Sequence, residues 1–272
     1  MPAAEPRFFR IAAVMADPTR SRMLATLLGG EHRSAGELAR VAGVTAQAAS
    51  TQLAQLVDSG LVTVRSQGRH KYFALADAEV AHALEALSLV AERDQVASRW
   101  QRPAYQPFKQ ARRCYGHLAG ELGVAQFEML VRCGHLRPGA CNPAQDMELS
   151  DSGRAWAAEL GLALGGTSGA RFAYPCMDWS ERKDHLAGAL SRVLLEHYLA
   201  QHWLAAERDS RALKLTPQGQ RVLLPMLASG YAWLQAELAP CLPPASPLLS
   251  YPRTWTRPPP GTVLRWPQVR IG

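Results

Sequence analysis

Apolar residues near the start of the chain recur at the spacing of α-helices. Residues 8–15 follow this spacing and predict a short first helix. Asp17 then supplies an N-cap, and Pro18 suits the first position of a second helix because no backbone donor is needed there. The apolar residues of this second helix share one face: Met23, Leu24 and Leu27. Gly29 is predicted to end it.

Two more helices with a tight turn between them are predicted next. Ser34 and Glu37 have the spacing of a capping box at the start of a third helix. Gly43 forms the turn, and Thr45 caps a fourth helix that extends to Gly60. A helix, a short turn and a second helix are typical of a helix-turn-helix.

The apolar period changes after Gly60 and predicts a β-hairpin. Residues 61–66 and 70–75 are rich in strand-forming side chains and are joined by a turn that contains Gly68. Four basic residues gather near the tip of this hairpin: Arg65, Arg69, His70 and Lys71. Residues 77–98 return to a helical period, with an apolar stripe made of Val80, Leu84, Leu87 and Ala91.

Three stretches, in this order, resemble the ArsR/SmtB family of bacterial winged-helix repressors: ADPTRSRML, ELARVAGVTAQAASTQLAQLVDSGLV and RSQGRHKYFAL. The resemblance covers residues 8–98, about a third of the chain. It implies a DNA-binding transcriptional repressor that forms a homodimer through helix 77–98 and the first helix. Such a dimer places two recognition helices about one DNA turn apart and implies a roughly palindromic operator in double-stranded DNA.

The resemblance also assigns the residues that contact DNA. The recognition helix corresponds to residues 45–57, and its early, groove-facing positions are Thr45, Gln47, Ala48, Ser50, Thr51 and Gln52. The wing contributes basic side chains for the phosphates, namely Arg65, Arg69, His70 and Lys71.

The effector sites of relatives in this family do not carry over to this chain. Many relatives bind metals or metalloids with a cysteine pair on the helix before the recognition helix, but residues 37–42 contain no cysteine. Others bind zinc between their last helices, and Asp77, Glu79 and His82 lack that spacing, so His82 is expected on the helix surface. We therefore expect an effector to be sensed further along the chain.

An internal repeat marks the next part of the chain. The letters HLAG occur at 117–120 and again at 185–188, and similar residues follow each copy. The repeats are predicted at about 108–160 and 176–230, each as helix, turn, short strand and capped helix. The predicted fold is mainly α with short β wings. Its parts are an N-terminal winged helix-turn-helix (1–99), a C-terminal duplicated winged-helix-like domain (100–239) and a disordered Pro/Arg-rich tail (240–272).

Cysteine and histidine accompany both copies of HLAG. Asp178 begins a capping-box pattern, so a helix is predicted from 179, with Cys176 just before it and with Asp178, Glu181 and His185 on one face. Cys114 and His117 are predicted to share a helix face in the first repeat. If the repeats pack about a pseudo-twofold axis, a site for Zn²⁺ or another thiophilic ion forms from Cys114, His117, Cys176 and His185.

Other functions stay open at this point. Cys176 fits a thiol sensor of reactive species, because a helix N-terminus and nearby cations lower a thiol pKa. A small aromatic ligand fits a pocket lined by Trp156, Phe172, Trp179, Tyr198 and Trp203. Two alternatives belong to other classes: an enzyme with Cys176 as nucleophile and His185 as base, and a protein-interaction module that uses helix 189–204.

Composition indicates the compartment, and the distribution of charge bears on DNA binding. The sequence shows neither a long apolar run nor a signal segment, so we expect a cytoplasmic protein with no membrane partner. Its five cysteines, an odd number, are then free thiols or ligands. The net charge of +7 does not by itself indicate DNA binding, because four arginines lie in an acid-free tail: Arg253, Arg257, Arg265 and Arg270.

Overall fold

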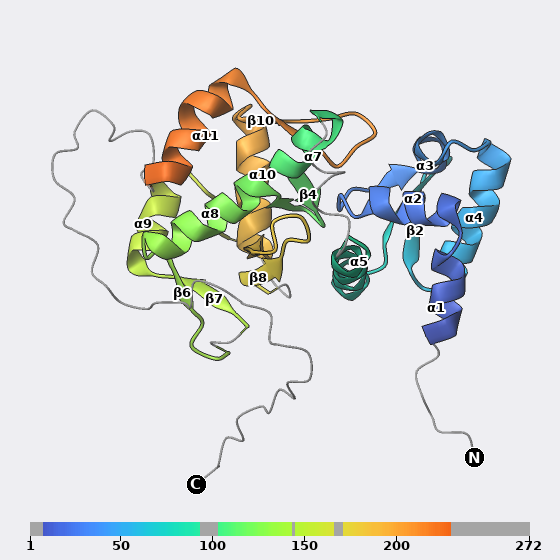
Figure 1. Ribbon diagram of the computed structural model, residues 1–272, viewed down its shortest axis with the longest axis horizontal. Coiled ribbons are helices and arrows are strands. Elements are labelled where there is room, and N and C mark those ends of the chain that lie inside the picture. Colours follow the sequence, from blue (N-terminus) through green and yellow to red (C-terminus); the bar gives the residue numbers. More distant parts are fainter. Residues whose placement is uncertain (1–7, 93–102, 143–144, 166–170, 230–272) are drawn as a thin grey trace, which may run out of the picture. The chain divides into compact units, whose positions relative to one another are not determined.

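The structure is a computed structural model that describes residues 8–92, 103–142, 145–165 and 171–229 (Figure 1). The predicted tail at 240–272 lies outside these residues. No helix in the described ranges has the length and apolar character needed to cross a membrane.

Local capping fixes the N-terminal helices where the sequence predicts them. The Asp17 side chain accepts a hydrogen bond from Arg20 N at 2.9 Å, Ser34 closes a capping box with Glu37, and Thr45 accepts from Ala48 N at 3.2 Å. These caps begin three of the four helices, whose bounds are α1 (Phe8–Met15), α2 (Pro18–Leu27), α3 (Ala35–Ala42) and α4 (Ala46–Asp58).

The predicted hairpin forms the wing of a winged helix-turn-helix. A three-stranded antiparallel sheet has the order β1-β3-β2, with β1 (Arg33–Ser34), β2 (Val62–Gln67) and β3 (His70–Leu75). The turn is made by Gly68 at a φ of 59°. Helix α5 (Ala78–Ala91) follows, and the last predicted residues of this helix lie outside the described chain.

The remaining described residues contain the same order of elements twice. After η1 (Pro103–Tyr105) and α7 (Gln106–Gln110), each set consists of hairpin, helix, hairpin and helix. The first set is β4 (Arg112–Cys114), β5 (His117–Ala119), α8 (Glu121–Arg132), β6 (Leu136–Pro138), β7 (Met147–Leu149) and α9 (Asp151–Glu159). The second is β8 (Tyr174–Met177), β9 (Asp184–Ala187), α10 (Ala189–Ala200), β10 (Leu204–Ala206), β11 (Leu213–Leu215) and α11 (Pro217–Ser229).

The HLAG segments are strands, so the prediction that helices carry them is wrong. Helix α10 begins at Ala189 and not at 179, and α8 begins at Glu121. The physical reason lies in the glycines: Gly120 and Gly188 have φ values of 81° and 98° and stand just before each helix. A Cβ atom on Gly120 would lie 2.4 Å from Lys109 O, which is too close for any other residue.

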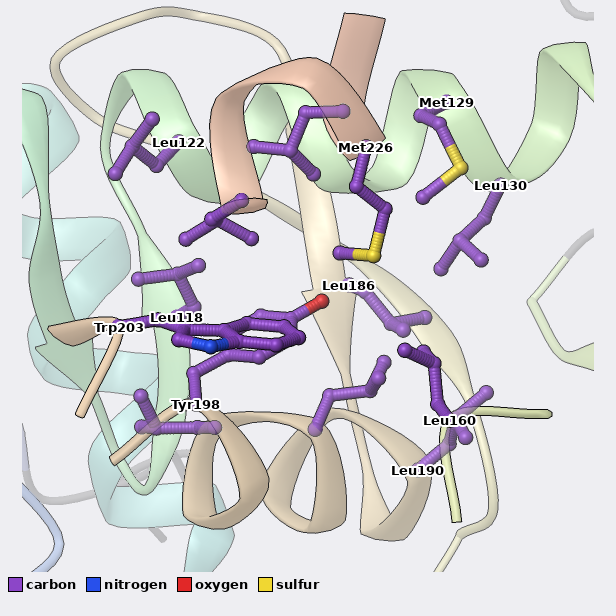
Figure 2. Close-up of a cluster of buried hydrophobic side chains, with 14 of the residues drawn as sticks. Leu118, Leu122, Met129, Leu130, Leu160, Leu186, Leu190, Tyr198, Trp203 and Met226 are labelled. Atoms are coloured by element: carbon purple, nitrogen blue, oxygen red, sulfur yellow. The ribbon is translucent and has the colours of Figure 1, made fainter. Parts of the chain in front are cut away.

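The two sets of elements enclose one hydrophobic core (Figure 2). Leu118 of β5 and Leu186 of β9 are fully buried and enter it from the paired hairpins. The rings of Tyr198 and Trp203 stack in this core at a centroid distance of 5.5 Å. The apolar side of α10 is also buried here, so it is not the exposed patch that the interaction-module alternative requires.

The predicted aromatic pocket is therefore wrong. Trp156, Tyr198 and Trp203 are core residues and Phe172 packs against the same core. Trp179 is buried as well, with the Arg112 guanidinium 4.4 Å above its ring. Other side chains of the domain pack around these rings, so the rings do not line an open cavity.

Candidate metal centre

Two β-hairpins carry the four Cys and His side chains that the sequence singled out. In the first hairpin Cys114 is the cross-strand partner of His117, across a turn in which Tyr115 and Gly116 have φ values of 47° and 88°. In the second, Cys176 is the cross-strand partner of His185. Cysteine and histidine thus occupy the same relative place in both hairpins, although the number of residues between them differs.

The two hairpins bring all four side chains together. One ligand atom from each of Cys114, His117, Cys176 and His185 lies within 4.8 Å of the other three. We call these four residues the Cys/His cluster. Three of them are buried and Cys176 is half-buried. Their predicted positions, on a helix face and at a helix N-terminus, are wrong, because the residues lie on strands that face each other.

The two imidazole rings contact each other and leave buried nitrogens free. The ring centroids of His117 and His185 are 5.1 Å apart, with an interplanar angle of 37°. His117 Nδ1 and His185 Nε2 are buried and have no hydrogen bond of normal geometry within the described residues. An unpaired buried nitrogen is costly unless something else binds it. Each ring therefore offers a lone pair or a proton to the cluster.

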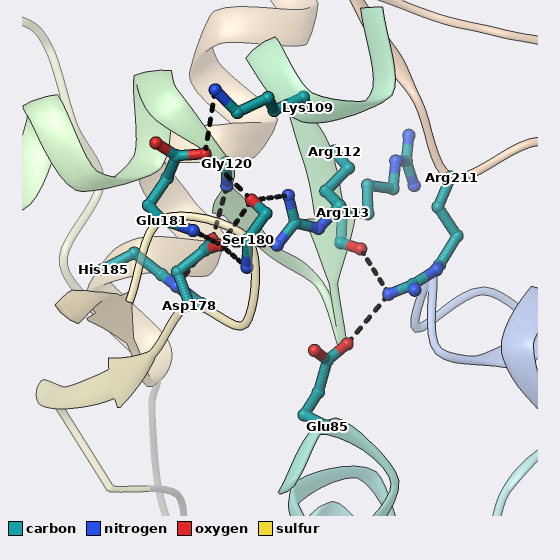
Figure 3. Close-up of polar contacts among 10 residues, drawn as sticks. All are labelled: Glu85, Lys109, Arg112, Arg113, Gly120, Asp178, Ser180, Glu181, His185 and Arg211. Carbon is teal, nitrogen blue, oxygen red and sulfur yellow. Dashed lines mark hydrogen bonds and ion pairs between the residues drawn. The ribbon is translucent and has the colours of Figure 1, made fainter. Parts of the chain in front are cut away.

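Asp178 contacts His185 and several other buried polar groups (Figure 3). Its Oδ2 lies 3.3 Å from His185 Nδ1 and accepts from Gly120 N at 2.7 Å. Its Oδ1 accepts from Arg112 Nη2 at 2.7 Å and from Ser180 N at 2.9 Å. Arg112 and Asp178 are fully buried, so this ion pair joins the two hairpins inside the domain. The predicted link between Asp178 and His185 exists, but it runs through a loop and not along a helix.

The two thiols differ in their readiness to ionise. A hydrogen bond to Cys176 and burial hold the pKa of Cys114 well above its ordinary value. The same hydrogen bond, now accepted by sulfur, and the neighbouring His185 lower the pKa of Cys176 to about 5, against the opposing effect of burial. At neutral pH the cluster therefore contains one thiolate and one thiol.

The two imidazoles differ in the same way. Burial, together with the charge of His185, holds the pKa of His117 well below its ordinary value. Burial would also lower the pKa of His185, but its contacts with Asp178 and Cys176 outweigh burial and raise the pKa to about 9. For Asp178 burial is opposed by His185 and Arg112, which hold the pKa of its carboxyl well below the usual range.

This donor set suits a thiophilic ion. Two thiolates and two neutral imidazoles are a common tetrahedral set for Zn²⁺, with bonds of about 2.3 Å to sulfur and about 2.0–2.1 Å to nitrogen. Two sulfurs on one such ion are about 3.8 Å apart. The ligand atoms already lie within 4.8 Å of one another, so only a small inward movement is needed. Asp178 supplies the outer carboxylate that commonly orients a ligating imidazole.

A pocket reaches the half-buried side of the cluster. It has a volume of about 300 Å³ and is lined by residues that include His82, Glu85, Tyr174 and Cys176. His82 Nε2 lies 3.0 Å from the Tyr174 hydroxyl, so the prediction that His82 is an ordinary surface residue is wrong. The pocket gives an ion or a small oxidant a route to Cys176.

The predicted DNA-contacting residues remain on the surface of the winged helix, and their role stays a prediction. Thr45, Gln47, Ala48, Ser50 and Thr51 are exposed on or next to α4, and the exposed wing carries Arg65, Arg69, His70 and Lys71. Gln52 differs from its neighbours because it is half-buried and its Oε1 accepts from Arg20 Nη1 at 2.7 Å. Gln52 therefore supports the packing of α2 against α4.

The predicted dimer stripe of α5 divides into two parts. Leu84 is buried in the core of its own winged helix and Val80 packs against that core. Leu87 and Val90 are 49% and 54% exposed, as are Phe8 and Phe9 of α1 at 75% and 71%. The exposed apolar surface available to a second copy is thus made by Leu87, Val90, Phe8 and Phe9.

Three charged residues with buried roles were missed from the sequence: Arg112, Glu85 and Arg211. Arg211 Nη1 donates to Glu85 Oε1 at 2.9 Å, and both side chains are less than one-tenth exposed. The available signal was the position of Arg112 beside apolar strand residues in the stretch ARRCYGHLAG. A charged residue in a buried strand needs a partner of opposite charge.

Comparison with known proteins gives similarity over both parts of the chain. Residues 15–65 match the family described as helix-turn-helix domain. The chain is 35% identical over 217 residues to the uncharacterized HTH-type transcriptional regulator YdfF of Bacillus subtilis, covering 79% of this chain and 94% of that protein. Because 217 residues exceed the winged helix, this similarity extends into the part that carries the cluster.

Two further similarities each cover about a third of the chain. The chain is 39% identical over 80 residues to the probable mercury resistance operon repressor of Streptomyces lividans, covering 29% of this chain and 61% of that one. A homodimeric winged helix-turn-helix DNA-binding domain from Mycobacterium bovis is 24% identical, with a TM-score of 0.31 and coverage of 35% of this chain and 94% of the domain.

Proposed function

We propose that this chain, which belongs to the ArsR/SmtB family of winged helix-turn-helix transcriptional regulators, changes its affinity for DNA when a thiophilic metal ion occupies the Cys/His cluster. Family membership makes it a DNA-binding regulator of transcription, and such a role suits the cytoplasm. The ion would be bound outside the winged helix, between the two hairpins. The similarity to the mercury resistance repressor covers only 29% of this chain, so it supports the class of protein and not this site.

One observation carries the proposal: four side chains with the right donor atoms converge from two hairpins that are far apart in the sequence. Burial would favour neutral, inert thiols in a purely structural role, but Cys176 has a pKa of about 5 and faces a pocket. The buried Nδ1 of His117, which has no hydrogen-bond partner within the described residues, also supports the binding of an ion. Zn²⁺ and other ions that prefer sulfur fit these donors better than Mg²⁺ or Ca²⁺, which prefer oxygen.

The proposal includes a homodimer on DNA. Two copies would bury Phe8, Phe9, Leu87 and Val90, which otherwise remain exposed as large apolar side chains. A two-fold dimer places two α4 helices on a palindromic site. Sedimentation equilibrium tests this point, because Leu87→Glu should give monomers whereas Leu84→Glu should unfold the winged helix.

Metal binding is tested directly by competition of purified full-length protein with a chromophoric chelator for Zn²⁺. We expect one ion per chain, and a loss of about 100-fold or more in affinity for Cys114→Ser and for Cys176→Ser. Cys141→Ser, an exposed cysteine outside the cluster, is the matched control and should bind as the wild type does. Zn²⁺ binding by both cluster variants with unchanged affinity would exclude the site.

A second function has its own supporting observation, namely that the Cys114 and Cys176 sulfurs lie within 4.8 Å of each other and that Cys176 lines a pocket. Peroxide would oxidise the Cys176 thiolate to a sulfenic acid with loss of water, and the Cys114 thiol would then displace a second water to form a disulfide. His185→Ala separates the two functions. It should abolish tight Zn²⁺ binding, whereas disulfide formation, seen by mass spectrometry, still proceeds.

The enzyme alternative keeps one feature in its favour, the order of thiol, imidazole and carboxylate in Cys176, His185 and Asp178. A nucleophile does not need a second thiol and a second imidazole at the same point, whereas an ion does. The relatives by sequence are regulators of transcription. We therefore assign the cluster to binding and not to catalysis.

A further inference from the structure

The loop between β10 and β11, residues 207–212, contacts both the strand that carries Cys114 and two helices of the winged helix. Its backbone pairs with β4: Arg113 N donates to Arg211 O at 2.8 Å, and Arg112 and Ala212 form an antiparallel bridge. Cys114 is the next residue along β4. A displacement of Cys114 toward a bound ion is therefore passed to this loop through backbone hydrogen bonds.

The first contact between the loop and the winged helix is a buried ion pair. Arg211 Nη1 donates to Glu85 Oε1 of α5 at 2.9 Å and to Arg113 O at 3.1 Å (Figure 3). The Arg211 and Glu85 side chains are only 9% and 6% exposed. A buried pair of this kind tolerates little change in geometry, since separation of its members leaves two charges without partners. Any shift of β4 must therefore move α5 or strain this pair.

The second contact reaches the helix that precedes the recognition helix. Arg40 of α3 binds Asp209 with both ends of its guanidinium, Nε to Oδ2 at 2.9 Å and Nη2 to Oδ1 at 2.5 Å. This pair is partly exposed, so its strength is limited by solvent. Its two-point geometry nevertheless fixes the orientation of α3 relative to the loop.

The two residues on either side of Cys114 add contacts of their own. Arg113 forms an ion pair with Glu31, in the segment between α2 and β1. Tyr115 N donates to Leu28 O at 2.6 Å, just after α2. Gly116 lies so close to Gly30 that a Cβ on Gly30 would be 2.6 Å from Gly116 N. The residues around Cys114 thus contact the winged helix directly at several points.

We propose that the 207–212 loop, through the Arg211–Glu85 and Asp209–Arg40 ion pairs, transmits occupancy of the Cys/His cluster to the winged helix. This proposal rests on the proposed function of the cluster and assigns its coupling to named residues. An ion at the centre of the Cys/His cluster draws inward ligand atoms that lie up to 4.8 Å apart, and β4 moves with Cys114. The loop follows β4, and α5 and α3 follow the loop. Arg211 and Asp209 are positioning residues in this scheme, since neither is a ligand of the ion.

The test measures ion binding and DNA binding separately on full-length protein. A duplex is first selected from random-sequence DNA by the wild type, with and without Zn²⁺. The coupling factor is the ratio of the dissociation constants for that duplex with and without Zn²⁺, and ordinary allosteric couplings are about 5- to 150-fold. We expect Arg211→Gln and Asp209→Asn each to reduce this factor, for Arg211→Gln to below about twofold. Zn²⁺ affinity should change by less than about threefold in both, because the four ligands remain.

Two further variants keep the result decisive. Arg211→Lys retains a cation beside Glu85 and should restore part of the coupling if Arg211→Gln loses it. Arg137→Gln breaks an exposed ion pair with Glu148 in the same part of the chain and should leave coupling unchanged. The Asp209→Asn variant should fold even if the Arg211→Gln variant does not, because the Asp209 side chain is partly exposed.

The outcomes separate this proposal from the one on which it rests. If wild-type protein binds no Zn²⁺, or binds it without a change in DNA affinity, the proposed function of the cluster fails. If the wild type responds and both Arg211→Gln and Asp209→Asn keep its coupling factor, only the role of the loop fails. A parallel loss of Zn²⁺ affinity in both variants would assign them to the folding of the site and also overturn the relay.

Discussion

His117 and His185 are in ring contact in opposite protonation states. Their centroids lie 5.1 Å apart, yet the pKa of His117 is held well below its ordinary value while that of His185 is raised to about 9. The difference arises because Asp178, at 3.3 Å from His185 Nδ1, and Cys176 both act on the second ring. Two hairpins that place cysteine and histidine alike are therefore electrostatically unequal.

This inequality predicts how ion affinity depends on pH. At neutral pH the cluster holds two protons that an ion must displace, one on Cys114 and one on His185. The logarithm of the Zn²⁺ association constant should therefore rise with a slope of about two per pH unit near pH 7. Below about pH 5 Cys176 also takes a proton and the slope should approach three; above about pH 9 His185 loses its proton and the slope should fall toward one.

Chelator competition at a series of pH values measures this slope, and calorimetry in buffers of different ionisation enthalpy counts the released protons independently. His117→Gln is a useful comparison, because His117 is neutral at pH 7 and its loss should weaken binding without changing the proton count. A slope of one or less near neutral pH would contradict the assigned protonation states.

Asp178→Asn should weaken ion binding and also destabilise the fold. The amide cannot hold the His185 imidazole as the carboxylate does, and loss of an outer-shell partner commonly costs about 10- to 100-fold in metal affinity. Arg112 would be left buried without its counter-charge, which costs about 3–5 kcal/mol in the free energy of unfolding. Urea denaturation and chelator competition measure the two effects.

Ser180→Ala is the matched control for Asp178→Asn. It removes a hydroxyl that donates to Asp178 Oδ1 at 2.8 Å and accepts from Arg112 Nη1 at 3.0 Å, but the carboxylate keeps its guanidinium and backbone partners. Its ion affinity should stay within a fewfold of the wild type. Equal losses in both variants would show that the network acts as a whole and that Asp178 has no special role toward His185.

The N-terminal elements could be predicted closely because their signals are local. Asp17, Ser34 and Thr45 each cap a helix with a side chain only three residues from its partner. The two strands of the wing follow from strand-forming residues around a turn at Gly68. Such signals do not depend on the rest of the fold, so the local sequence is enough to predict these caps and this turn.

The sequence predicted the four residues of the cluster, but it placed them on or next to helices and not on the strands that carry them. His117, Leu118 and Ala119 are all buried, so β5 has no alternation of apolar and polar residues by which a strand is recognised. The repeated glycines, Gly120 and Gly188, carried the missing information, since a positive φ with backbone in close approach excludes the middle of a helix. The partners Glu85 and Arg211 depend on tertiary contacts, which no local pattern specifies.

Gly120→Ala should be far more damaging than the same change at Gly161. Both glycines have positive φ, 81° and 70°, so alanine is strained at either place. At Gly161 nothing lies within 4 Å of the added Cβ, whereas at Gly120 it would meet Lys109 O at 2.4 Å. We expect Gly120→Ala to lose several kcal/mol more in the free energy of unfolding, measured in urea, and to lose Zn²⁺ binding with it. Equal stabilities would contradict the close approach.

Gln47 and Gln52 should behave differently in DNA binding although both were predicted to contact DNA. Gln47 is exposed near the start of α4, whereas the Gln52 amide is held by Arg20 at 2.7 Å. Gln47→Ala should reduce discrimination between a selected duplex and a scrambled one by about 1–3 kcal/mol if it reads a base. Gln52→Ala should leave discrimination unchanged and lower stability slightly, because its partner lies within the protein.

Arg69→Ala in the wing should act through phosphates instead of bases. Its side chain is exposed and has no ion-pair partner within the described residues. One lost phosphate contact weakens binding to selected and scrambled duplexes alike, and it lowers the slope of log K against log salt by about one. Fluorescence anisotropy over a range of salt concentrations measures both quantities for Arg69→Ala, Gln47→Ala and Gln52→Ala. If Arg69→Ala changes discrimination while Gln47→Ala changes only the salt slope, the wing reads sequence and α4 holds the backbone, the reverse of the assignment made here.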